Sequence, residues 1–134
     1  GGGGGLGWGM SETVLLLHEK PDGTRHYDWM LKVEGCADPA RPLATFRVGE
    51  RIDLVEGRFE GERIGDHREK YLTFEGDIGQ GRGRVRRMAR GRAVIESITG
   101  TDLAVVVTWE GGATRRYQGS AGIDGRWEFA AVGA

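Results

Sequence analysis

Short apolar runs, each closed by a turn signal, dominate the hydropathy pattern of this chain. Thr13 to Leu17 reads T-V-L-L-L, Leu103 to Trp109 is the most strand-like run, and no segment repeats apolar residues at helical spacing over three turns. Runs of this length between glycine- and proline-rich turns are typical of strands. The pattern predicts strands at 13–17, 25–33, 43–48, 81–88, 93–99, 103–109, 114–118 and 126–132, with shorter ones possible at 52–55 and 58–64.

These strands predict an all-β fold, a small closed or partly open β-barrel with short connections and little or no helix. The 25 glycines and the regular spacing of turn signals favour such an architecture. Trp29, Trp109 and Trp127 alternate with polar neighbours, which favours the core for all three. The first ten residues predict a disordered glycine-rich leader, and residues 11–134 predict one domain.

A hairpin is predicted at the turn Pro21-Asp22-Gly23, which joins the first two strands. With a three-residue loop whose glycine is left-handed, His18 pairs with His26, and the two side chains share a face. A two-residue Asp-Gly loop would place His18 on the opposite face instead. We expect the three-residue loop.

The sequence His26-Tyr27-Asp28-Trp29 is the candidate chemical centre. In an extended strand His26 and Asp28 point to one face, and an imidazole with a carboxylate can ligate one zinc or manganese ion. His18 from the paired strand is a candidate third ligand, and His67 is the only other histidine. A strand histidine can also be an ordinary surface or hydrogen-bonded residue, so spacing alone leaves both interpretations open.

A formal charge of −1 conceals a sharp division of charge along the sequence. Residues 50–77 carry nine acids, whereas residues 79–92 carry six arginines and no acid. As a strand, Arg82, Arg84 and Arg86 would line one face, and such a stripe fits the phosphates of a nucleic-acid backbone. A solvated edge strand protected by its charge is the alternative.

Other kinds of chemistry find no support in the sequence. There is no G-x-S-x-G elbow, and Cys36 lies in a proline-containing loop with no histidine nearby, so a serine or cysteine nucleophile is not indicated. The glycines of 79–92 lack the G-K-[ST] of a phosphate-binding loop. One cysteine favours a reducing, cytoplasmic location, and no apolar run approaches the ~18 residues of a membrane span.

Four stretches follow one another along the chain: T-R-H-Y-D-W-M-L, then L-A-T-F-R-V, then H-R-E-K-Y-L-T-F-E-G, and finally the arginine-rich stretch. This order of motifs resembles the 3′-phosphoesterase domain of bacterial DNA ligase D. It covers roughly residues 14 to 91. The pair H-Y-D and H-x₃-Y-x₂-F-E-G in this order is more specific than either motif alone.

The resemblance implies a metal-dependent enzyme that trims 3′ ends of DNA, removing a terminal ribonucleoside or a 3′-phosphate. By position, His26 and Asp28 would bind Mn²⁺, or another divalent ion such as Zn²⁺ or Co²⁺, while His67 and Tyr71 would address the scissile phosphate. Arg82, Arg84, Arg86 and Arg47 are the candidates for binding the nucleic-acid backbone. The implied partners are DNA or RNA 3′ ends and an end-repair protein such as a ligase. We also expect the protein to be a monomer and not to associate with membranes.

Two positions depart from the family pattern. Lys20 stands where the family has a further metal-binding histidine, and Met30 stands where it has an arginine. If the hairpin has the expected register, His18 can supply the ligand that is missing at Lys20. These departures leave an alternative function, a phosphoesterase-like barrel that binds nucleic acid or a protein partner without turnover.

Overall fold

The computed structural model describes residues 10–134, and it is all-β. Residues 1–9, most of the predicted leader, lie outside the described part. The strands are β2 (Ser11–Glu19), β3 (Arg25–Lys32), β4 (Leu43–Val48), β5 (Gly57–His67), β6 (Gly76–Asp77), β7 (Arg84–Ile98), β8 (Asp102–Trp109), β9 (Thr114–Ala121) and β10 (Arg126–Gly133), with a 3₁₀ turn η1 (Glu69–Leu72). Within 10–134 no helix is long and apolar enough to cross a membrane.

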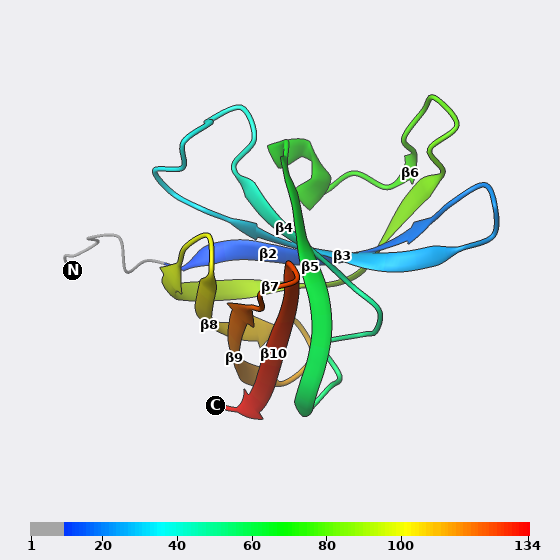
Figure 1. Cartoon of the computed structure of the whole chain (residues 1–134). Helices are drawn as coiled ribbons and strands as arrows, with labels where there is room; N and C mark the ends of the chain where they lie inside the picture. Colours follow the sequence, from blue (N-terminus) through cyan, green and yellow to red (C-terminus); the bar gives the residue numbers. More distant parts are fainter. Residues whose placement is uncertain (1–9) are drawn as a thin grey trace.

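The nine strands form one antiparallel sheet that closes into a ring, as the sequence predicted (Figure 1). The hydrogen-bonded order is β2-β3-β4-β5-β10-β9-β8-β7-β6, and a further pairing of β2 with β7 closes the circle. Eight strands therefore make the barrel-like wall, and β6 pairs with β7 outside it. Closure satisfies the backbone groups that an edge strand would leave unpaired.

The interior of the ring is filled by every second residue of its eight strands. Trp29, Phe46, Tyr117 and Phe129 are its largest fully buried side chains, and they pack edge-on or tilted against one another with centroids 5.0–6.0 Å apart. Offset contacts of this kind contribute about 0.5–1.5 kcal/mol each beyond burial. The predicted core position of all three tryptophans is confirmed: Trp29, Trp109 and Trp127 are each at most 3% exposed.

A second, smaller apolar cluster lies on the outer side of the wall. It combines side chains of β2, β3, β4 and β7 with Tyr71 and Leu72 of η1. Because successive residues of a strand face opposite sides, the neighbours of the interior residues point outward. Met30 therefore joins this cluster, while Trp29 packs inside the ring. The 3₁₀ turn is held there by hydrogen bonds from β7: Arg87 donates Nη1 to the Leu72 carbonyl at 3.2 Å.

The predicted three-residue hairpin loop is confirmed. His18 pairs with His26 and Glu19 with Arg25 across β2 and β3. The amide of Lys20 donates to the Thr24 carbonyl at 2.8 Å, and Gly23 has the expected left-handed φ of 88°. The side chains of the two histidines therefore share the outer face.

The prediction of two separate strands at 81–88 and 93–99 is wrong. Residues 81–88 and 93–99 belong to a single strand, β7, that begins at Arg84 and runs through Gly91. Gly91 permits close strand packing, because a Cβ there would lie 2.5 Å from the Thr108 carbonyl oxygen. The strand spans two neighbours, pairing with β2 over 84–93 and with β8 over 91–98.

The short strand predicted at 52–55 is also wrong, whereas 58–64 lies inside β5. Residues 51–54 form a turn in which the Leu54 amide donates to the Arg51 carbonyl at 3.0 Å. Ile52 is fully buried, and its carbonyl accepts a 2.7 Å hydrogen bond from the Tyr117 hydroxyl. Ile52 is apolar and buried like a core strand residue, but it enters the ring core from a turn and has no strand pairing.

Candidate active site

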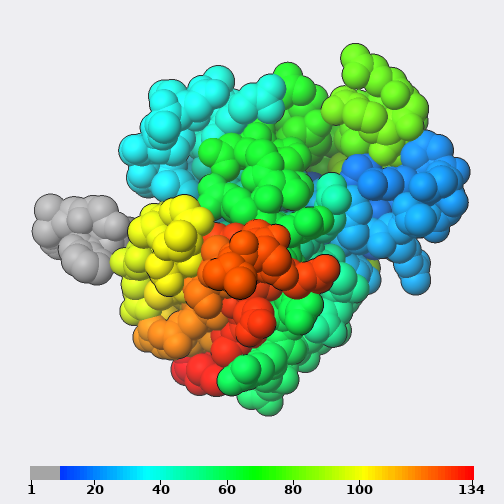
Figure 2. Space-filling model, viewed as in Figure 1, coloured from blue at the N-terminus to red at the C-terminus, as the bar shows by residue number. Residues whose placement is uncertain are grey.

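A cavity of about 590 Å³ opens on the outer face of the wall, between the β2–β3 hairpin, β4, β5 and the segment 68–85. His18, His26, Asp28, His67 and Tyr71 all line it. Figure 1 shows η1 and β6 above the crossing of β3 and β5, and Figure 2 shows the hairpin, in blue, beside the yellow-green turn that precedes β7. The strand alternation that fills the core thus delivers the predicted site residues to one place.

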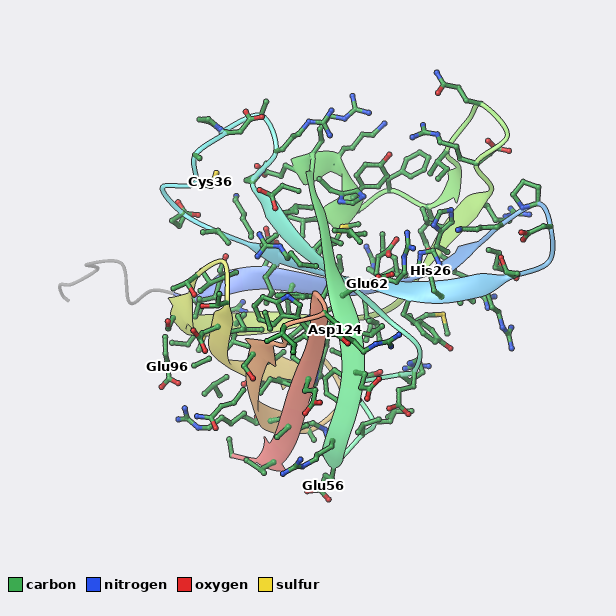
Figure 3. The ribbon with its side chains drawn as sticks, in the orientation of Figure 1. His26, Cys36, Glu56, Glu62, Glu96 and Asp124 are labelled. Atoms are coloured by element: carbon green, nitrogen blue, oxygen red, sulfur yellow. The ribbon has the colours of Figure 1, made fainter. Side chains whose placement is uncertain are left out.

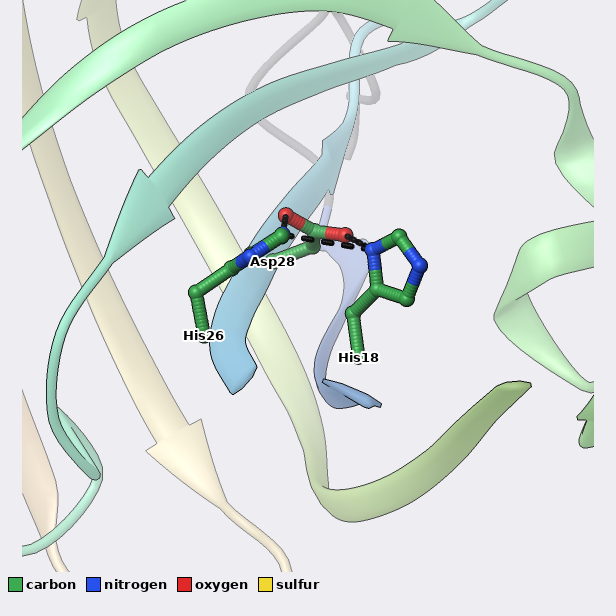
Figure 4. Close-up of side chains that lie close together, drawn as sticks. All are labelled: His18, His26 and Asp28. Carbon is green, nitrogen blue, oxygen red and sulfur yellow. Dashed lines mark hydrogen bonds and ion pairs between the residues drawn. The ribbon is translucent and has the colours of Figure 1, made fainter. Parts of the chain in front are cut away.

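Three candidate ligands converge within this cavity, as Figure 4 shows. His26 Nε2 lies 3.1 Å from Asp28 Oδ1, His18 Nδ1 lies 3.7 Å from Asp28 Oδ2, and the two imidazole nitrogens are 3.3 Å apart. Two donors that each lie ~2.1 Å from one ion are at most ~4.2 Å apart. The three separations involve both oxygens of Asp28, and one donor atom from each residue lies within 4.8 Å of the other two. The three side chains are therefore placed to share a single ion.

The ring of His18 is oriented by the main chain of the turn before β7. Its Nε2 lies 2.8 Å from the Arg82 carbonyl oxygen, which can only accept a hydrogen bond. Neutral His18 therefore carries its proton on Nε2 and leaves the Nδ1 lone pair toward Asp28. A backbone carbonyl behind an imidazole is the usual arrangement around metal-binding histidines.

The carboxylate of Asp28 is buried, with 4% of its surface exposed. Its Oδ1 has no hydrogen-bond partner among the described residues, because the 3.1 Å contact with His26 lacks hydrogen-bond alignment. A buried, unpartnered carboxylate oxygen is costly in a folded protein. A cation at this point would remove that cost, so the donor set fits a divalent ion.

His67 and Tyr71 line the far wall of the same cavity, with ring centroids 5.5 Å apart in an edge-on contact. His67 Nδ1 lies 3.0 Å from the hydroxyl of Thr45, a fully buried residue of β4. Burial lowers the pKa of His67, and the nearby Asp28 carboxylate offsets part of that shift. His67 therefore favours the neutral imidazole.

The cavity is cationic although the whole chain has a formal charge of −1. Its lining carries five cations against two carboxylates; they are Lys20, Arg41, Arg47, Arg68 and Arg82 against Asp22 and Asp28. Arg47 sits directly across from Asp28 in the β3–β4 register, and its Nε is buried without a partner in the described structure. The same guanidinium pairs through Nη1 with Glu62 Oε1 at 3.4 Å, and guanidinium groups suit oxyanions, above all phosphate.

The predicted face of three arginines is not present. Gly83, with φ of 98°, separates Arg82 from the strand, so Arg82 lies in the cavity wall and its guanidinium bonds to the Ile78 carbonyl at 2.7 Å. Arg84 and Arg86 flank Val85, which belongs to the outer cluster, and the two arginines are exposed and do not line the cavity. The structure therefore divides the predicted phosphate-binding set: Arg47 and Arg82 reach the cavity, whereas Arg84 and Arg86 face away from it.

No protein-family model and no curated protein matches this chain. The two departures from the resemblance can nevertheless be placed. Lys20 lines the cavity, and Met30 is buried beneath it, 1% exposed. His18 pairs with His26 across β2 and β3, and Arg47 brings a guanidinium beside Asp28 from the neighbouring strand.

Three residues of the site escaped the sequence reasoning. Arg41 follows from no pattern, because it lies in the loop before β4, whereas Arg68 is adjacent to His67 and could have been suspected. Thr45 was detectable as the one polar residue within the apolar run L-A-T-F. Cys36, placed in a loop by the sequence, lies far from His26 (Figure 3).

Proposed function

We propose that this protein is a divalent-metal-dependent phosphoesterase that acts on 3′ ends of nucleic acid. The observation that carries the proposal is the convergence of His18, His26 and Asp28 on one point of a cation-lined cavity. Two imidazoles and a carboxylate suit Mn²⁺, and also Zn²⁺ or Co²⁺. When bound, such an ion supplies Lewis-acid polarisation of a phosphoryl oxygen.

The chain's own residues support the remaining tasks. Arg47 and the cations at the rim, Arg41 and Arg68, attract and orient a phosphate by charge and by paired N–H donors. Tyr71 offers a phenol for a hydrogen bond to a phosphoryl oxygen. The exposed Arg84 and Arg86 can hold the polynucleotide outside the cavity. The cytoplasmic location, monomeric state and end-repair partner belong to the same proposal.

The test is release of inorganic phosphate from a 3′-phosphorylated DNA oligonucleotide in the presence of Mn²⁺. Asp28→Asn should lose the metal-stimulated release, because it removes the only carboxylate of the converging set. Glu96→Gln is the matched control: it also changes a carboxylate to an amide, but Glu96 lies well away from His26 (Figure 3). Equal release by wild type and Asp28→Asn would refute the proposal.

A binding protein without turnover is the second candidate, and the cationic Lys20 in the cavity wall is the observation that favours it. An ammonium in the same cavity opposes the binding of a metal ion electrostatically. This candidate predicts DNA affinity that falls steeply with salt and does not respond to chelator or to Asp28→Asn. Metal-dependent phosphate release would exclude it.

A further inference from the structure

The hydroxyl of Thr45 lies between a backbone carbonyl oxygen and one ring nitrogen of His67. Thr45 Oγ1 lies 3.0 Å from the Leu43 carbonyl oxygen and 3.0 Å from His67 Nδ1. The carbonyl can only accept, so it takes the single hydroxyl proton. The hydroxyl oxygen must then accept from His67, which places the proton of the neutral imidazole on Nδ1.

The same arrangement recurs in the core of the ring, away from the cavity. Thr13 donates its hydroxyl to the Met30 carbonyl at 2.7 Å and accepts from the Trp29 indole N–H at 3.0 Å. An indole nitrogen is always a donor, so the direction of this second bridge is certain. A buried threonine that relays between a backbone carbonyl and a ring N–H is thus an established element of this fold.

With Nδ1 protonated, Nε2 of His67 retains its lone pair. The groups that act on its pKa from the surrounding elements are Asp28, Asp66 and the Gly65 carbonyl, which raise it, and Arg41, which lowers it. Burial outweighs them and lowers the pKa. A neutral imidazole whose Nε2 is unprotonated can accept a proton at that nitrogen but cannot donate one from it to a phosphate oxygen.

We propose that His67 is the proton acceptor of this site and that Thr45 is the positioning residue that fixes its tautomer. The inference rests on the proposed phosphoesterase function and deepens it. A water molecule attacks the phosphorus and forms the new P–O bond while Nε2 takes one of its protons. The P–O bond to the 3′ oxygen breaks with its electron pair on that oxygen, which then receives the proton from the imidazolium, giving an alcohol and inorganic phosphate.

The tautomer is measured first, on the full chain without metal, by long-range ¹H–¹⁵N correlation of the histidine rings at neutral pH. The chain has three histidines, and His67→Gln identifies the signals of His67. Wild type should show His67 protonated on Nδ1. Thr45→Val should shift His67 toward the Nε2-protonated form, Thr45→Ser should restore the original, and Thr13→Val should leave it unchanged. A wild-type His67 that is protonated mainly on Nε2 overturns the assignment.

The second measurement is the pH profile of kcat/KM for phosphate release from the 3′-phosphorylated oligonucleotide with Mn²⁺. If His67 accepts a proton, the rate falls as pH drops through its pKa, and His67→Gln lowers the rate by about 10²–10⁴-fold and removes that limb. Thr45→Val should cost about 10–100-fold, whereas Thr13→Val, which breaks the same kind of hydrogen bond, should not change the profile. A rate that rises toward acid pH overturns the proposal, because it indicates a phosphate-donating imidazolium.

The two measurements separate the failure of this inference from failure of the proposed function. Phosphate release that persists unchanged in His67→Gln refutes the proton acceptor and leaves the phosphoesterase standing. No release by any variant refutes the phosphoesterase and the acceptor together, while the ¹⁵N data still decide the orienting role of Thr45.

Discussion

Binding of a divalent ion should stabilise this protein, and Asp28→Asn should abolish that gain without harming the metal-free fold. Asp28 is 4% exposed and one of its oxygens has no hydrogen-bond partner in the described structure. In the absence of metal this buried charge is a cost, so its replacement by a neutral amide of the same shape should be tolerated. The same carboxylate is the strongest attraction for a cation at the site.

The magnitude follows from mass action. An ion present at 100 times its dissociation constant adds ~2.7 kcal/mol to the free energy of unfolding. For a chain of 134 residues this corresponds to a rise in Tm of roughly 8–10 °C. The metal-free Asp28→Asn variant should unfold within about 1 kcal/mol of the metal-free wild type.

Thermal unfolding followed by circular dichroism, with chelator and with increasing Mn²⁺, measures both quantities. Wild type should show a Tm that rises with the logarithm of the Mn²⁺ concentration, and His18→Gln should show a reduced rise. Glu96→Gln should follow wild type throughout. A Tm increase that survives in Asp28→Asn would refute the assignment of the site, as would the absence of any increase in wild type.

Three further predictions concern the fold that supports the site. Gly119→Ala should destabilise the protein by about 1–3 kcal/mol in urea unfolding, because its Cβ would lie 2.5 Å from the buried ring of Phe129. Burial raises the pKa of Tyr117 to about 12, so the fold favours the neutral phenol. The free energy of unfolding should therefore be full below pH ~10 and fall by up to about 2 kcal/mol toward pH ~12. Tyr117→Phe should remove this loss. Gly83→Ala should weaken Mn²⁺-induced stabilisation, since its Cβ would lie 2.0 Å from the Glu19 carbonyl oxygen and displace the turn.

Each of these variants has a control within the chain. Gly100→Ala adds a Cβ with no atom within 4 Å and should be nearly neutral beside Gly119→Ala. Gly81→Ala imposes positive-φ strain in the same turn as Gly83→Ala but meets no neighbouring atom. If Gly81→Ala weakens the metal effect equally, then strain, and not the contact with Glu19, is responsible. An unchanged alkaline slope in Tyr117→Phe would contradict the burial of that phenol.

The sequence specified the ring and its core well, because both depend on local rules. Alternation placed Trp29 inward and Asp28 outward, and the chemistry of Pro21-Asp22-Gly23 set the hairpin register that brings His18 to His26. It failed where tertiary packing overrides local signals. Two strands were predicted at 81–88 and 93–99, although Gly91 permits close packing within one continuous strand. Ile52 was predicted in a strand, although it enters the ring core from a turn.

The site was harder to predict, because its anion-binding side chains come from segments with no pattern of their own. Arg41 and Arg68 are unremarkable in the sequence, and they meet only because the loop before β4 and the start of η1 border the same cavity. The conspicuous arginine run misled in part, since one glycine, Gly83, turns Arg82 away from Arg84 and Arg86. Charge counted along a chain is a poor guide to charge gathered around a point in space.

The two faces of the wall support different parts of the molecule. The same strands β2, β3 and β4 carry the ring core on alternate residues and the cavity on the residues between them. Met30 belongs to the outer cluster, whereas its neighbour Trp29 packs in the ring core. His18, His26, Asp28 and Arg47 line the cavity and lie outside the ring core. It follows that destabilisation and loss of metal binding should separate cleanly among the variants: Gly119→Ala should weaken the fold and keep the ion, and Asp28→Asn should do the reverse.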